Sequence, residues 1–254
     1  MSFADYYNLP EGNNATLKYS SFYDTVDSTC PCPSIMNNGF SYQTRRVLKQ
    51  INVSNVTDMS SMCRNCTNLQ FIDGIENWDV SNVTDMSYCF YYCTQLLLDN
   101  IKNWDVSNLT KMDNMFEDCR KNTSLDLSGW DTSKVTSMSG TFNISTLTTL
   151  SSIRADSLII PSYGNLFGYN SGSLVDFGGF INLKSNWNGS YSVDKLSALS
   201  HQSLINILNG LYDFVGNGET PTSSQGKIKF GSTHLAKLTE EEKAIATNKG
   251  WTLS

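Results

Sequence analysis

Apolar and polar positions follow a pattern that occurs four times between Val53 and Phe142. Each copy reads close to Val-Ser-Asn-Val-Thr-Asp-Met, and successive copies are 27, 26 and 26 residues apart. A period of this length is typical of supersecondary units that stack on one another, because a single unit cannot bury its own apolar side. The pattern therefore predicts a solenoid. The methionines that end the four runs are Met59, Met86, Met112 and Met138.

The apolar residues around each methionine have the spacing of a helix. In the second copy they are Val83, Met86, Cys89, Phe90 and Cys93, at offsets of 0, 3, 6, 7 and 10. Such spacing places side chains along one buried stripe of an α-helix. We therefore expect each copy to start a helix near its Ser-Asn pair, with the Asn as the cap. The last position of the stripe is a cysteine in three copies, at Cys66, Cys93 and Cys119.

Short apolar runs separate these expected helices, and each run is followed by a Trp-Asp pair. The runs are Leu69 to Ile72, Leu96 to Leu98 and Leu125 to Leu127. One extended segment, one turn and one helix per copy predict that the extended segments line up as a parallel sheet. The tryptophans should then form a column inside the stack, made of Trp78, Trp104 and Trp130.

Roughly residues 50 to 150 resemble the BspA-type leucine-rich repeat family. Its signature is close to Trp-Asp-x-Ser-Asn-Val-Thr-x-Met-x-x-Met-Phe-x-x-Cys-x-x-Leu. The chain departs from it where Ile51 replaces the Trp, where Cys63 and Cys89 interrupt the Met-Phe pair, and at Lys134 and Ser145 in the fourth copy. Terminal repeats are usually atypical because they cap the stack. The resemblance implies an adhesion or surface-recognition scaffold and no enzyme.

Residues 1–50 are rich in aromatic side chains without a clear period. They fit an irregular cap on the first repeat. They equally fit an anchoring segment that buries its aromatic side chains against a partner, since apolar patches mark interfaces. The candidate anchoring surface consists of Tyr6, Tyr7, Phe22 and Tyr23.

The rest of the chain predicts a connecting region and a C-terminal cap. Residues 151–195 are rich in Gly, Ser and Asn, which is turn and loop composition. In residues 196–254 a helical pattern follows Ser200, and residues 227–230 read as a strand. Thr239 and Glu242 form a capping box for a second helix that ends before Gly250 and a last strand. The expected fold is thus α/β: a short leucine-rich-repeat-like solenoid of about four repeats (51–150) between an irregular N-terminal cap (1–50) and an α/β C-terminal cap.

The C-terminal segment resembles a module that ends many tailed-phage surface and tail-associated proteins. The residues that carry the resemblance are 201–212, 235–242 and 246–253, and the same module also ends some bacterial surface repeat proteins. The first residues, Met1 to Tyr7, show no basic segment, apolar stretch or cleavage site, so we expect no secretory signal. That expectation favours a virion protein, which is made in the host cytoplasm, over an exported one.

Charge and hydropathy limit the classes of partner that the protein can bind. The net charge is −6, the isoelectric point is near 4.9, and Lys and Arg are scattered. This distribution argues against nucleic-acid binding. No apolar run approaches the ~18 residues that a membrane helix requires, so we expect no membrane insertion.

Little in the sequence points to chemistry. Cys63 and Cys66 have the spacing of a zinc pair, but no second close pair completes four ligands, so we expect structural thiols. His201 and His234 have no nucleophile at a recognisable spacing, which argues against catalysis. We expect no metal and no cofactor. Three aspartates near the ends of the extended segments are either solvated turn residues or a row that contacts Ca²⁺ or a glycan: Asp73, Asp99 and Asp126.

These observations predict a non-enzymatic phage virion structural protein, a surface, fibre or tail-associated component. It would present the repeats for protein attachment or host recognition. Its expected partners are other virion proteins, a host surface protein or glycan, and further copies of itself. The alternative is a secreted bacterial surface adhesin of the BspA type. A hydrolase that acts on glycans would need a defensible pair of carboxylates, which the sequence does not offer.

Overall fold

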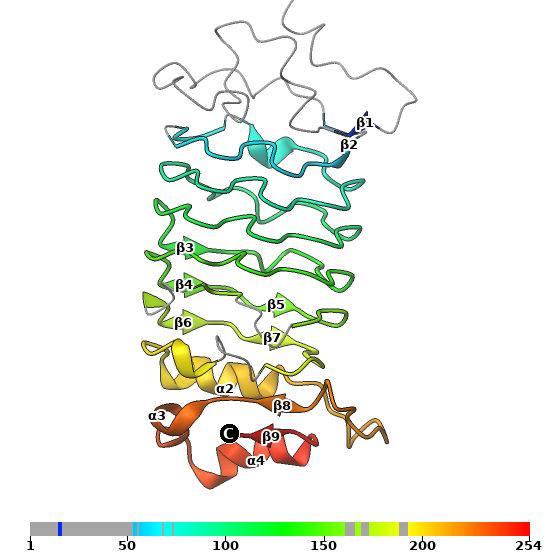
Figure 1. Cartoon of the computed structure of the whole chain (residues 1–254), viewed down its shortest axis with the longest axis vertical. Coiled ribbons are helices and arrows are strands. Elements are labelled where there is room, and N and C mark those ends of the chain that lie inside the picture. Colours follow the sequence, from blue (N-terminus) through cyan, green and yellow to red (C-terminus); the bar gives the residue numbers. More distant parts are fainter. Residues whose placement is uncertain are drawn as a thin grey trace, which may run out of the picture.

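The computed structural model describes residues 15–16, 53–54, 56–67, 69–72, 74–160, 166–168, 173–187 and 193–254. The fold is α/β, with parallel strands and few helices. Figure 1 shows successive turns of the chain stacked along the long axis, with the labelled α-helices gathered at the C-terminal end. The expected anchoring residues at positions 6, 7, 22 and 23 lie outside the described residues.

The strands are short, and all named pairs are parallel. Pairs form between β1 and β2, within the order β3-β4-β6, between β5 and β7, and between β8 and β9. The bounds are β1 Ala15–Thr16, β2 Val56–Asp58, β3 Ser124–Leu125, β4 Thr149–Leu150, β5 Ile153–Arg154, β6 Asp176–Phe177, β7 Phe180–Ile181, β8 Lys227–Ile228 and β9 Thr252–Leu253.

Backbone hydrogen bonds join the repeat copies at alternate residues. Met59, Ser61, Cys63 and Asn65 each donate an N–H to a carbonyl of the next copy, at 2.7–2.9 Å. Between them, Met62 and Arg64 donate to carbonyls three positions back within their own copy, and Ser60 donates to the Asp58 carboxylate at 2.9 Å. The same alternation recurs one period later. Single parallel bridges join Asp58, Asp85, Lys111 and Ser137 across the four copies.

The expected helix in each copy is wrong, because the described part of the repeats contains turns in its place. The turns close three-residue steps, as from the Met62 N–H to the Met59 carbonyl at 3.2 Å, whereas an α-helix bonds four residues back. Left-handed residues such as Ser61 (φ 61°) and Asn65 (φ 64°) also interrupt any helix. A chain of three-residue turns buries every third residue, so it imitates helical spacing.

The core consists of columns of like side chains. Trp104 stacks between Trp78 and Trp130, with ring centroids 6.0 and 5.9 Å apart. Phe116 stacks between Phe90 and Phe142 at 6.2 and 6.4 Å. The indole N–H groups of Trp104 and Trp130 each donate to a carbonyl of the preceding copy at 2.8 Å, so their burial leaves no unpaired donor.

The predicted connecting region also takes part in the stack. Its strands β5, β6 and β7 pair with neighbouring turns of the chain, and Leu183 and Trp187 form parallel bridges to Leu211 and Ile228. Phe167, Phe177 and Phe180 are buried there. Buried aromatic side chains thus supply the core of this segment. Its Gly-, Ser- and Asn-rich composition had predicted turns and loops instead of strands.

Two C-terminal helices agree with the sequence. α2, His201–Asn209, begins at Ser200, whose hydroxyl accepts from the Ser203 N–H. α4, Glu240–Asn248, begins with the predicted capping box of Thr239 and Glu242. Gly250 adopts φ 86° beyond α4, the left-handed conformation expected of it.

Other elements of the cap were not predicted. The 3₁₀ helix η6 spans Val193–Lys195. The short helix α3, Gly231–Leu235, has no polar capping residue before it. A further 3₁₀ helix, η4, spans Ile75–Asn77 in the first repeat.

Met86→Asp should strongly destabilise the protein, because Met86 is fully buried and the new carboxylate would have no partner there. We expect a loss of about 3 kcal/mol or more, equivalent to a fall of roughly 10 °C in Tm. Thermal unfolding of purified variants measures it. Leu97→Asp is the matched control, because Leu97 is 41% exposed and should tolerate the charge. Equal Tm values for the two variants would contradict the assignment of Met86 to the core.

Candidate recognition surface

Side-chain hydrogen bonds run between copies along the outside of the stack. The Thr84 hydroxyl donates to the Thr57 carbonyl at 3.0 Å, and the Thr110 hydroxyl donates to the Thr84 carbonyl at 2.9 Å. The Asn108 amide donates in the same way to the Ser81 carbonyl at 2.8 Å. Because these bonds recur in each copy and consume polar side chains, they hold the stack together and offer little to a ligand.

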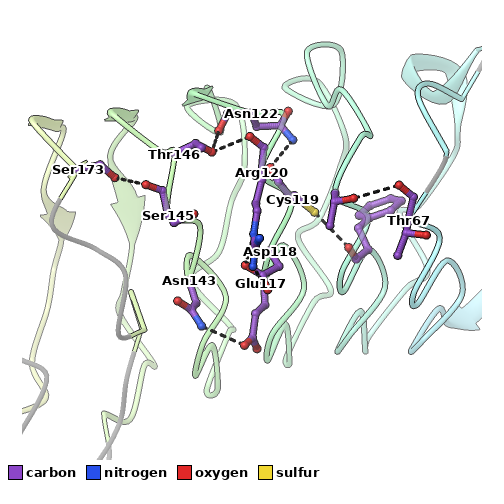
Figure 2. A network of polar contacts seen from close by, with 12 residues as sticks. Thr67, Glu117, Asp118, Cys119, Arg120, Asn122, Asn143, Ser145, Thr146 and Ser173 are labelled. Atoms are coloured by element: carbon purple, nitrogen blue, oxygen red, sulfur yellow. Dashed lines mark hydrogen bonds and ion pairs between the residues drawn. The ribbon is translucent and has the colours of Figure 1, made fainter.

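A second polar network lies along another side of the stack (Figure 2). Asn122 is buried, accepts from the Leu98 N–H at 3.0 Å and donates to the Leu96 carbonyl at 2.8 Å. Arg120 holds the buried Asp118 through two bonds of 2.9 and 3.0 Å. Next to this pair, the Asn143 amide donates to Glu117 at 3.0 Å. Burial raises the pKa of Glu117.

The column cysteines, Cys66, Cys93 and Cys119, are buried thiols. Cys93 donates to the Cys63 carbonyl at 2.9 Å and Cys119 to the Phe90 carbonyl at 3.1 Å. Burial raises the pKa of Cys66 and Cys119 well above the ordinary value of 9.0. In the part of the chain that the structure describes, no three His, Cys, Asp or Glu side chains converge to hold a metal ion. Cys30 and Cys32 lie outside it.

The two histidines sit apart in the C-terminal cap. His201 meets Glu242 at 2.8 Å on the surface between α2 and α4. His234 is buried in α3, and burial lowers its pKa. His201 thus joins two helices, and His234 packs in the interior of the cap.

The predicted acidic row is only partly described. Asp73 is outside the described residues, and Asp99 is exposed. Asp126 forms a 2.6 Å ion pair with Lys102, whose hydrogen bond lowers the pKa of Asp126 to about 2. Asp126 also lines a shallow groove of about 500 Å³ over β3, β4 and β6, which Gln202 and Asn206 of α2 close on one side.

A cluster of aromatic side chains lies on the loop edge of the second copy. Tyr88 and Tyr91 meet edge to face with ring centroids 5.4 Å apart, and Tyr91 and Tyr92 are 4.7 Å apart. The Arg64 guanidinium from the first copy lies 5.0 Å from the centre of the Tyr88 ring and 5.1 Å from that of Tyr91. We call these four residues the tyrosine patch. The patch was not predicted from the sequence, although the run Tyr-x-x-Tyr-Tyr stands within one repeat.

The structure places the predicted repeat-core residues inside the stack. The four column methionines and the three column cysteines are at most 1% exposed, and the three tryptophans at most 6%. Their side chains are therefore unavailable to a partner. Among the described residues, no helix combines the length and the apolar character needed to cross a membrane.

Comparison with known protein families gives a match that includes the repeat copies. Residues 34–153 match a family described as "Mycoplasma protein of unknown function, DUF285". This family is associated with BspA-like repeat proteins. No curated protein and no solved structure matches the chain. The matched segment ends before residues 196–254, so their resemblance to a phage module stays an expectation.

The buried thiols should make the protein less stable in alkaline solution. In the unfolded chain they ionise near pH 9.0, whereas burial raises the pKa of Cys66, Cys89 and Cys119 in the folded protein. The thiols therefore contribute fully to the free energy of unfolding below pH 9. This contribution is lost as the pH rises above 9, by up to about 1.4 kcal/mol per thiol and pH unit.

Denaturant unfolding from neutral pH to about pH 10 measures this loss. The variant that combines Cys66→Ala, Cys89→Ala and Cys119→Ala is the control, because it removes these three thiols and keeps every lysine and tyrosine. We expect a shallower pH dependence in that variant. Identical slopes in both proteins would show that other groups cause the alkaline loss.

Proposed function

We propose that the chain is a non-enzymatic recognition protein, built on a leucine-rich-repeat-like solenoid of the BspA type. The observation that carries the proposal is the division between interior and surface positions of each copy. Interior positions keep the same chemistry from copy to copy, as in the methionine and tryptophan columns. The bridged positions between them change from Asp58 and Asp85 to Lys111 and Ser137.

A stack with these properties suits binding rather than catalysis. The hydrogen bonds between copies fix the backbone, so side chains on the surface can vary while the scaffold is unchanged. In the groove over β3, β4 and β6, the pKa of Asp126 is about 2. A glycosidase would need a carboxylic acid that keeps its proton near neutral pH, so Asp126 is unsuited to that role.

For the setting we propose a phage virion, as a surface, fibre or tail-associated component. Its support is the resemblance of the C-terminal segment, whose carrying residues form α2, α4 and β9 in one cap. The partners would be neighbouring virion proteins and a host surface protein or glycan. Self-association is part of the proposal, since closed symmetry reuses one surface patch.

A second candidate is a bacterial surface adhesin of the BspA type. One observation favours it: the family that matches residues 34–153 is described from Mycoplasma, a cellular organism. The recognition role is the same in both candidates. They differ in whether a virus particle or a cell displays the repeats.

Mass spectrometry of purified particles tests the setting. We expect the protein to co-purify with virions at a constant ratio to the major capsid protein through successive density gradients. An abundant host cytosolic protein serves as the contamination control. Recovery only from the host envelope or culture medium would replace the virion by the adhesin.

A further inference from the structure

The tyrosine patch occurs in only one of the four repeat copies. At the positions of Tyr88, Tyr91 and Tyr92, the other copies carry small or polar residues, apart from one isoleucine. They are Ser61, Arg64 and Asn65 in the first copy, Asn114, Glu117 and Asp118 in the third, and Gly140, Asn143 and Ile144 in the fourth. The stack therefore does not need aromatic side chains there.

Two of the tyrosines adopt a backbone conformation that disfavours them. Tyr88 has φ 60° and Tyr92 has φ 58°, in the left-handed region. Equivalent positions of other copies hold Asn65, Asn114 and Gly140, which tolerate this region well. A bulky residue there is an outlier, and such strain clusters at functional sites. The patch is thus kept against the preference of the fold.

The patch is accessible and held in place. Tyr92 is 37% exposed. Asp118 raises the pKa of Tyr92 and is itself held by Arg120 at 2.9 Å. Tyr88 and Tyr91 are half-buried and support each other edge to face. Contact with a partner would therefore require little reordering of side chains, which lowers the entropic cost of binding.

Arg64 carries a charge that no carboxylate among the described residues neutralises. Of the arginines in the described ranges, Arg120 and Arg154 pair with carboxylates at 2.9 and 2.8 Å, whereas Arg64 forms no such pair. Its Nε is buried without a hydrogen-bond partner. A guanidinium held against aromatic rings is well placed to bind a carboxylate from outside.

We propose that the tyrosine patch binds an acidic segment of a partner protein: Arg64 takes a carboxylate while neighbouring apolar groups pack on the tyrosine rings. Tyr and Arg are the side chains that dominate binding energy at protein interfaces. A neutral sugar that stacks on a ring fits less well, because it brings no carboxylate to the Arg64 guanidinium that lies over Tyr88 and Tyr91. The proposal rests on the recognition role proposed above.

Selection of short random peptides displayed on yeast, against the full-length protein, tests it. We expect enriched peptides to contain Asp or Glu beside aromatic or aliphatic residues. Arg64→Ala and Tyr91→Ala should each weaken their binding about tenfold or more. Peptides whose acids are changed to Asn or Gln should also lose binding. Arg154→Ala and Tyr212→Asn are matched controls, because they remove an ion-paired arginine and a tyrosine in cation–π contact elsewhere.

The left-handed tyrosines provide a second readout. Tyr88→Asn and Tyr92→Asn should weaken peptide binding like Arg64→Ala, yet leave Tm unchanged or higher by roughly 2–4 °C, because the strain is relieved. A merely structural role predicts the reverse, a lower Tm with intact binding of the selected peptides.

Three results would overturn the proposal: no enriched peptides, peptides that bind the patch variants as well as the native protein, or a Tm that falls sharply in both Asn variants. A glycan array in parallel identifies the rival, since glycan binding lost in Arg64→Ala would assign the patch to a sugar. Because particle composition is measured separately, failure here leaves the test of the virion setting intact.

Discussion

The structure depends on the hydrogen bonds that alternate residues, from Met59 to Asn65 in the first copy, donate to the next copy. These bonds use the N–H groups that the short turns leave over, so the backbone is satisfied without regular helices and with few regular strands. They also fix each copy at the same register as its neighbours. Once the register is fixed, like side chains meet, which explains the stacked rings of Trp104 and Phe116.

This constraint separates positions that cannot vary from those that can. Met86, Cys93 and Trp104 face the interior, where a change of volume or charge would be felt by two neighbouring copies. The side chains of Tyr88 and Lys111 face outward, so the interior of the stack does not depend on them. The scaffold can therefore keep one architecture while its surface chemistry differs from copy to copy.

The sequence predicted what is local or repeated. The period, the buried columns and the capping box of Thr239 and Glu242 depend on short-range patterns, and such patterns are readable. The helices within the repeats were wrong because three-residue turns and helices share the same apolar spacing. Gly140 and Asn114, two residues after their methionines, were the indication of left-handed turns. Those positions, read together, would have argued against a helix.

Two features were not predicted from the sequence: the strands of the connecting region and the tyrosine patch. The strands near Phe177 and Phe180 pair with residues 27 positions earlier in the chain, which is the spacing of the repeats. This segment lacks the Val-Ser-Asn-Val-Thr-Asp-Met run, so that motif did not reveal them. The tyrosine patch was not predicted because its three tyrosines occur in one copy only, whereas the prediction used residues that recur in every copy. Its contact with Arg64 also joins different copies, and this depends on the register of the stack.

The C-terminal end of the stack has a consequence for solubility. A column of parallel turns ends in an open row of backbone donors and acceptors, which could template another chain and grow into fibres. Here the last strand, β9, has only two residues, and α4 packs beside it. So short an edge offers few bonds to an incoming strand, and the helix restricts its approach. The cap thus covers this edge of the stack and opposes aggregation through it.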